Sequence, residues 1–101
     1  MIKVCNLRHG MDAGACHVKI DRSSPLGNPF YMKGESQRDK VCNDYELWIG
    51  ERIAANDPKI INELNRLLTL ARKYGKLILY CWCAPKRCHG ETIKRLIESK
   101  L

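Results

Sequence analysis

The residues best suited to do chemistry lie between positions 81 and 90, where the chain reads Cys-Trp-Cys-Ala-Pro-Lys-Arg-Cys-His-Gly. Three cysteines and a histidine gather here, whereas the other cysteines, Cys5, Cys16 and Cys42, are scattered along the chain. A thiol becomes a nucleophile or a metal ligand once it loses its proton, and an imidazole exchanges protons near neutral pH. This segment is therefore the first candidate for a catalytic or binding site.

The pattern around this segment predicts the end of a strand followed by the start of a helix. Residues 77–82 form a continuous apolar run, which is typical of a buried central strand. Ile93 and Ile97 mark one face of a final helix. Helix N-termini carry free N–H groups and a partial positive charge, so we expect a lowered pKa for Cys88, next to His89.

Three interpretations of the segment stay open. In the first, which we favour and which needs no metal or cofactor, Cys88 is a thiolate nucleophile or anion contact and His89 a general acid or base. In the second, a structural zinc ion binds the side chains of Cys81, Cys83, Cys88 and His89. The spacing of these residues is not a standard zinc pattern, however. In the third, Cys81 and Cys83 pack in the core while His89 caps the helix.

Further polar side chains are candidates for holding a ligand. Arg8 follows the first predicted strand, Asn28 lies on a rigid loop of turn-forming residues, and Arg38 begins a helix. Clustered arginines bind phosphate or carboxylate groups. The ligand is therefore expected to contact Arg8, Arg22, Asn28, Arg38 and Cys83. The alternatives to ligand binding are structural: Asn28 holds a turn, and Arg38 pairs with an acidic side chain. If the first two strands pair antiparallel, Arg8 and Arg22 lie at opposite ends of the sheet and form no cluster.

The predicted elements follow the order β-β-α-α-β-α in a single α/β domain over residues 1–101. Residues 2–7 and 16–21 are expected to form strands with a hairpin-like start. Helices are expected to begin at Ser36 as N-cap and at Asp57-Pro58, the latter ending at Gly75. The architecture predicted from this order is a small, Rossmann-like mixed sheet flanked by helices. Two aromatic residues, Phe30 and Trp82, are interpreted as core residues rather than as a stacking platform for a base.

The charge of the chain is uneven. The formal net charge is +7, and residues 51–101 carry eleven Lys and Arg against five Asp and Glu, whereas residues 1–50 carry seven against six. A basic half attracts polyanions, which favours a phosphate-bearing partner. No run of about 18 apolar residues is present, so no membrane span is expected. Six cysteines without an export signal favour a reducing compartment over a disulfide framework, and we expect a cytoplasmic protein.

Several motifs resemble those of a known family. They are Asn6-Leu7-Arg8, Asp21-Arg22-Ser23, Gly27-Asn28-Pro29-Phe30, Arg38 with Tyr45, and Cys81-Trp82-Cys83-Ala84-Pro85 closing on Cys88-His89-Gly90. Together they are similar to the bacterial and phage family called domain of unknown function 4326, over nearly the whole chain. The resemblance implies a small bacterial or phage protein in the cytoplasm of the host cell, and it implies no particular activity.

The function we expect is binding of a nucleotide or another phosphate-bearing small molecule at the Cys-His helix start. Processing of that ligand through Cys88 and His89 is a hypothesis that leaves open whether the protein is an enzyme. The alternative is a non-enzymatic module that binds nucleic acid or a host protein through its basic helices. This alternative includes the case in which a zinc ion stabilises the module.

Overall fold

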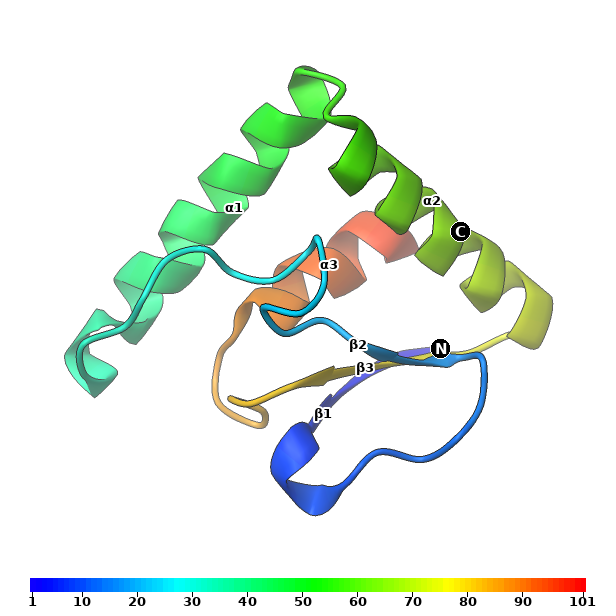
Figure 1. Ribbon diagram of the computed structural model, residues 1–101, viewed down its shortest axis with the longest axis horizontal. Coiled ribbons are helices and arrows are strands. Elements are labelled where there is room, and N and C mark those ends of the chain that lie inside the picture. The colour runs from blue at the N-terminus through cyan, green and yellow to red at the C-terminus, as the bar shows by residue number, and fades with distance from the viewer.

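The computed structural model describes residues 1–101 as one α/β domain in which three helices lie on one side of a three-stranded sheet (Figure 1). The elements in chain order are β1 (Ile2–Asn6), a short 3-10 helix η1 (Leu7–His9), β2 (His17–Lys19), a second 3-10 helix η2 (Glu35–Gln37), α1 (Arg38–Ala54), α2 (Pro58–Tyr74), β3 (Leu77–Cys81) and α3 (His89–Glu98). The predicted fold class and element order are confirmed.

The sheet is parallel throughout, so the mixed sheet and the hairpin-like start are wrong. β3 lies in the middle and pairs in parallel with β1 on one side and with β2 on the other. The loop between β1 and β2 is long enough to carry the chain to the far edge of the sheet and leave a place for β3. As a result, all three strands end at the same edge, where ligand sites form in open parallel sheets.

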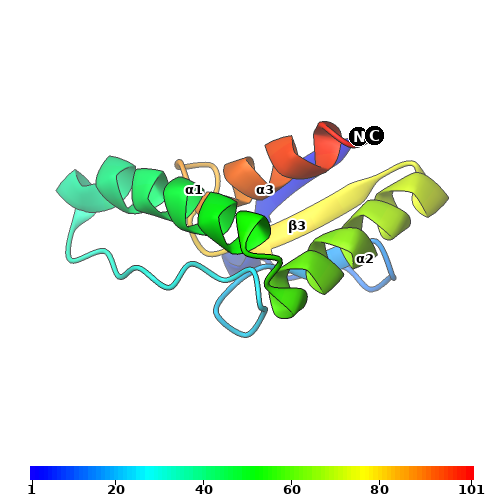
Figure 2. The ribbon, with the colours of Figure 1, turned by 90° about the horizontal axis from the view of Figure 1, so that it is seen from above.

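The main core lies between the sheet and the helices. Alternate residues of β3, Leu77, Leu79 and Cys81, face this core, and the whole strand is buried as predicted. α3 approaches the sheet closely at Gly90, where an added Cβ would lie 2.9 Å from the Val4 Cγ1 atom. Seen from above, α1 and α2 diverge from their connection, and α3 lies beside β3 (Figure 2).

The predicted ends of α2 are confirmed, but the predicted start of α1 is wrong. The Asp57 side chain accepts a hydrogen bond from the Lys59 amide at the N-terminus of α2, and Gly75 closes that helix with a φ of 69°. Ser36 does not cap α1, because residues 35–37 form η2 and α1 follows from Gln37 without a side-chain cap. The Gln37 amide donates to the Gly34 carbonyl oxygen at 3.0 Å, and this hydrogen bond over three residues makes a 3-10 turn ahead of α1.

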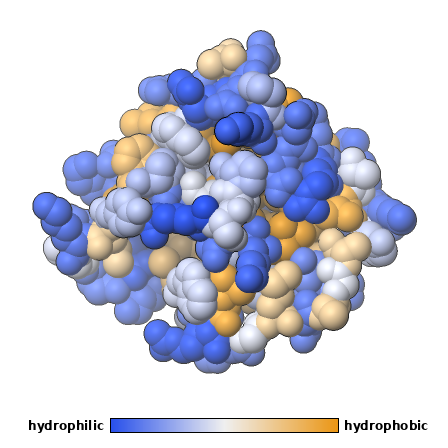
Figure 3. All heavy atoms as spheres, viewed as in Figure 1, coloured by the Kyte–Doolittle hydropathy of each residue, from blue (hydrophilic) through white to orange (hydrophobic).

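None of the helices is both long enough and apolar enough to span a bilayer. The face seen in Figure 1 is mostly hydrophilic, with separate hydrophobic areas among the polar side chains (Figure 3).

Candidate functional site

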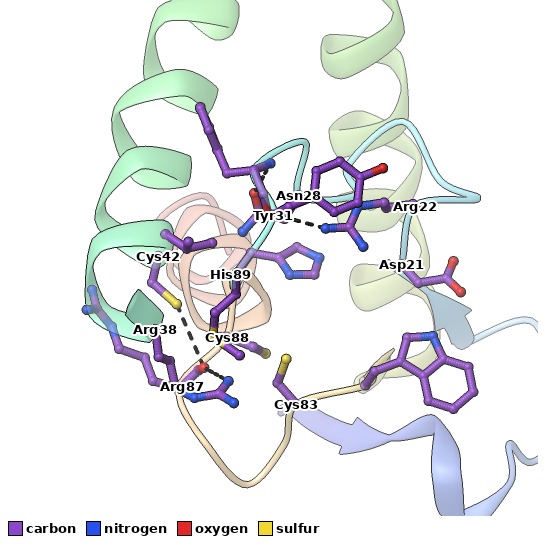
Figure 4. Close-up of a pocket in the computed structure, with 14 residues that line it drawn as sticks. Asp21, Arg22, Asn28, Tyr31, Arg38, Cys42, Cys83, Arg87, Cys88 and His89 are labelled. Carbon is purple, nitrogen blue, oxygen red and sulfur yellow. Dashed lines mark hydrogen bonds between the residues drawn. The ribbon is translucent and has the colours of Figure 1, made fainter. Parts of the chain in front are cut away.

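A cavity of about 260 Å³ lies beyond the C-terminal ends of β2 and β3, between these strand ends, α1 and the start of α3. Its walls come from the loop after β2, from the first turns of α1 and from the segment that runs from the end of β3 to the start of α3 (Figure 4). The lining residues are Asp21, Arg22, Asn28, Phe30, Tyr31, Met32, Arg38, Val41, Cys42, Trp82, Cys83, Arg87, Cys88 and His89. The parallel sheet explains this gathering, because it places the segments after β2 and β3 at one edge.

The structure brings together all but one of the residues predicted to form the site. Those that line the cavity are Arg22, Asn28, Arg38, Cys83, Cys88 and His89. Arg8 does not line it, because η1 carries this exposed side chain away from β1, the edge strand on the far side of β3 from β2. The neighbouring Asn6 holds the β3–α3 connection, because its side-chain amide donates to the carbonyl oxygen of Ala84 at 2.8 Å.

His89 is held in one protonation state by its surroundings. Its Nε2 atom lies 2.5 Å from the Ile20 carbonyl oxygen, which can only accept, so Nε2 carries the proton. Burial lowers the pKa of the imidazole, and Tyr45 packs edge-on against the ring with centroids 5.0 Å apart. The ring is therefore neutral at pH 7, and its other nitrogen, Nδ1, is an acceptor without a partner in the protein.

Cys88 differs from the expected free thiolate. It is the N-cap of α3 and is only 4 % exposed, and its Sγ accepts a hydrogen bond from the Gly90 amide. Its Sγ also lies 3.0 Å from that of Cys81, and this contact, together with burial, raises the pKa of Cys88. The same hydrogen bond lowers the pKa of Cys81 to about 6. The expectation of a lowered pKa at Cys88 is therefore wrong, because at this helix start the contact with Cys81 and burial outweigh the hydrogen bond from the Gly90 amide.

The four side chains of the alternative zinc site do not form a metal-binding group. Cys81 and Cys88 contact each other, whereas the Nε2 atom of His89 is taken up by Ile20. Cys83 is half-buried in the cavity wall, where it contributes, after Glu35, to raising the pKa of Arg38. The cavity thus offers a thiol and an imidazole acceptor rather than a preformed set of metal ligands.

The three arginines of the cavity differ in their partners. Arg38 binds Glu35 through two nitrogens, at 2.9 and 2.7 Å, and this pairing lowers the pKa of Glu35 to about 2. Arg87 binds Asp39 at 3.1 Å. Arg22 has no acidic partner: it donates to the Phe30 carbonyl oxygen at 3.2 Å and lies over the Tyr31 ring at 4.0 Å. Arg22 is therefore the arginine with charge left for an anionic ligand.

The loop that carries Asn28 is held by hydrogen bonds, and the turn-holding interpretation of Asn28 is confirmed. Its Oδ1 atom accepts a hydrogen bond from the Phe30 amide at 2.9 Å, which leaves its side-chain NH2 group to the cavity. Leu26, in the same loop, is fixed to α1 because the Tyr45 hydroxyl donates to its carbonyl oxygen at 2.7 Å. The pairing interpretation of Arg38 is confirmed in the same way by its contact with Glu35.

The start of α3 supplies unpaired backbone donors. The amides of Arg87, Cys88 and His89 donate to no acceptor in the protein, whereas the Glu91 amide donates to the Cys88 carbonyl oxygen. His89 is the first residue of α3, and a free amide in the first turn of a helix attracts anions; the amides of Arg87 and Cys88 lie just before that turn. They lie in the segment that forms one wall of the cavity.

The aromatic lining of the cavity was not recognised in the sequence. Trp82 is 61 % exposed and Tyr31 is 75 % exposed, so the interpretation of Trp82 as a core residue is wrong. β3 ends at Cys81, and the next residue leaves the buried strand although it continues the apolar run. Phe30 is half-buried against the core, as interpreted. No spacing signal distinguishes Tyr31, which follows Phe30 directly on the loop.

Comparisons with known proteins give one result. Neither the curated proteins nor the solved structures contain a match to the chain. A family model described as Domain of unknown function (DUF4326) matches residues 5–99, which include every residue of the cavity. The chain therefore belongs to the DUF4326 family.

Proposed function

We propose that this protein binds a nucleotide or another small phosphate-bearing molecule in the cavity at the start of α3. The observation that carries the proposal is the combination, in one cavity, of an arginine without an acidic partner and a helix start with unpaired amides. Arg22 supplies the charge, and the amides of residues 87–89 supply directed donors. Phosphate oxygens accept from both kinds of donor.

The size and lining of the cavity favour a small ligand. Its volume of about 260 Å³ lies just below the roughly 300–1,000 Å³ that is typical of small-molecule sites. The exposed Trp82 ring at its wall suits a flat, apolar group such as a base, which stacks on aromatic side chains. A mononucleotide combines both features, a flat base and a phosphate.

Processing of the ligand would depend on His89. A neutral imidazole with an unprotonated Nδ1 accepts a proton from a ligand hydroxyl or from water, which is the role of a general base. The hydrogen bond from Nε2 to the Ile20 carbonyl keeps the ring in this tautomer. Cys83, rather than the buried Cys88, is the thiol of the β3–α3 connection that is partly open to a ligand in the cavity.

Calorimetric titration tests the binding proposal with a matched pair of variants. The ligands are pyrophosphate, nucleoside monophosphates and diphosphates, and the uncharged nucleosides. Arg22→Gln and Arg8→Gln each remove one exposed arginine, but only Arg22 lines the cavity. We expect Arg22→Gln to weaken phosphate binding by about tenfold or more, because a charge-assisted hydrogen bond is lost. Arg8→Gln is expected to change the affinity little.

The same titration can contradict the proposal. Equal weakening in the two variants would place the phosphate outside the cavity and favour general attraction to the basic surface. Equal affinity for nucleosides and nucleotides would show that the phosphate contributes nothing to binding, which contradicts the role proposed for Arg22. Absence of binding by every phosphate-bearing compound would overturn the proposed function.

A further inference from the structure

Two buried cysteines lie with their sulfur atoms in contact. Cys81 ends β3 and Cys88 caps α3, and their Sγ atoms are 3.0 Å apart although the residues are seven positions apart in the chain. A disulfide bond is about 2.05 Å long, so each sulfur would need to move by only about 0.5 Å to form one. No other pair among the six cysteines makes a sulfur–sulfur contact, and all six are free thiols.

The surroundings of the pair favour reaction over inert packing. The 3.0 Å separation is that of a hydrogen bond in which either sulfur can donate, and the amide of Gly90 donates to the Cys88 sulfur. The pair is therefore held as a thiol beside a thiolate near neutral pH, with the pKa of Cys81 lowered to about 6. A thiolate is the form of cysteine that attacks oxidants.

Access to the pair is restricted and comes from one direction. Cys88 lines the cavity, whereas Cys81 does not and is 1 % exposed. Cys88 is itself 4 % exposed, so a protein disulfide cannot reach it in the folded chain. A reagent must be small enough to enter the cavity, as hydrogen peroxide and small alkyl hydroperoxides are.

We propose that Cys81 and Cys88 are a redox-active dithiol that a small hydroperoxide oxidises to an intramolecular disulfide through the cavity. The proposal is independent of the ligand proposed above, because it requires only that the cavity admits the peroxide. The disulfide would join the end of β3 covalently to the start of α3. The segment between these two elements contains Cys83 and forms part of the cavity wall.

The reaction balances without any further reagent. As the Cys88 sulfur attacks the peroxide, its proton passes to the Cys81 thiolate; an S–O bond forms and the O–O bond breaks. The leaving oxygen takes a proton from water, and the hydroxide that remains carries away the negative charge of the original thiolate. The sulfenic acid on Cys88 is then attacked by the Cys81 sulfur, which forms the S–S bond and breaks the S–O bond. The hydroxide that leaves combines with the proton of Cys81. The thiol and the thiolate together lose two electrons, and these reduce hydrogen peroxide to water, or an alkyl hydroperoxide to an alcohol and water.

Peptide mapping after oxidation tests the proposal. The reduced protein is treated with hydrogen peroxide, its remaining thiols are alkylated, and it is digested with trypsin. Cleavage after Lys86 and Arg87 places Cys88 on a different peptide from Cys81 and Cys83. We expect a disulfide-linked pair of these peptides, with the other cysteines alkylated.

Matched serine variants identify the partner of Cys88. Cys83→Ser is expected to keep the linked peptides, and Cys81→Ser to lose them and to accumulate sulfenic acid on Cys88. Loss of the link in Cys83→Ser together with its survival in Cys81→Ser would overturn the assignment to Cys81. Absence of the link in the unmodified chain would overturn the proposal whether or not the variants fold. Because no ligand is added, these outcomes are independent of the nucleotide titration.

Discussion

At the scale of single residues, the fold sets the protonation state of the cavity. A carbonyl group fixes the tautomer of His89, the contact with Cys81 raises the pKa of Cys88, and the ion pair with Glu35 raises the pKa of Arg38. In each case the group responsible lies on a different structural element from the residue that it affects. Arg22 forms no ion pair with an acidic side chain, which makes it the residue on which the proposed binding depends.

The lowered pKa of His89 predicts how stability responds to acid. In the unfolded chain the imidazole takes up a proton near its ordinary pKa of 6.5, whereas the buried ring in the folded chain does so only at lower pH. This residue therefore contributes stability above pH 6.5 that is lost as the pH falls toward the folded pKa, at up to about 1.4 kcal/mol per pH unit.

Urea unfolding at several pH values measures this contribution. In His89→Gln the amide can still donate to the Ile20 carbonyl oxygen but does not titrate, so the loss of stability in acid should be smaller than in the parent chain. His9→Gln, which removes an exposed histidine, is the control and should keep the parent slope. Parallel slopes in all three proteins would show that His89 is not buried in its neutral form.

At the scale of elements, the loop after β2 is built around a close backbone approach at Gly27. A Cβ added there would lie 2.4 Å from the Asp21 carbonyl oxygen and 2.6 Å from the Arg22 Cα, and neither backbone atom can yield as a flexible side chain could. Gly27→Ala should therefore move the segment that carries Arg22 and Asn28, and should destabilise the fold by about 1–3 kcal/mol.

The matched control for this substitution is Gly50→Ala. Gly50 lies within α1, and an added Cβ there meets no atom within 4 Å. Removing a glycine from a helix interior should stabilise the protein by about 0.5–1 kcal/mol. The two alanine variants should thus shift the urea midpoint in opposite directions. A Gly27→Ala midpoint equal to that of the parent chain would mean that the loop is not packed as described.

Local patterns in the sequence predicted most of the elements. The capping pair Asp57-Pro58, the stop at Gly75 and the apolar run of β3 each determine their own structure, and all three are confirmed. Strand pairing is different, because the position of β3 between β1 and β2 depends on long-range contacts that leave no local signal. The prediction of a mixed sheet failed for that reason.

The sequence predicted which residues form the candidate site better than it predicted their contacts and protonation states. The sequence was enough to name Arg22, Asn28 and Arg38 as site residues, but their meeting at the cavity depends on the parallel strand order, which the sequence did not predict. The contact between Cys81 and Cys88 could not be predicted, because it depends on how closely α3 packs against the sheet. The exposure of Trp82 likewise depends on where β3 ends.

At the scale of the whole molecule, the thiol pair predicts an unusual dependence of stability on pH. Below the Cys81 pKa of about 6, the pair holds two protons in the folded and the unfolded chain alike. Between about 6 and the ordinary value of 9.0, the folded pair holds one proton and the unfolded pair two, so the free energy of unfolding rises with pH. Above 9.0 the unfolded pair loses both protons while Cys88 keeps its own, so this contribution falls again.

Cys81→Ser isolates this contribution in urea unfolding between pH 6 and 10 under reducing conditions. The rise in the free energy of unfolding between pH 6 and 9 should be reduced in this variant, whereas Cys5→Ser, outside the pair, should retain it. A rise of equal size in the two variants would contradict the assignment of a shared proton to Cys81 and Cys88.

The most direct test of the proposed function is amide chemical-shift mapping during titration with a nucleoside diphosphate. Binding in the cavity predicts shifts at the amides of Arg87, Cys88 and His89 and at the indole of Trp82, with little change along α2, whose basic side chains lie outside the cavity. Shifts concentrated along α2 instead would support the basic-module alternative. An unchanged start of α3 at saturating ligand would contradict the proposal that the cavity is a phosphate site.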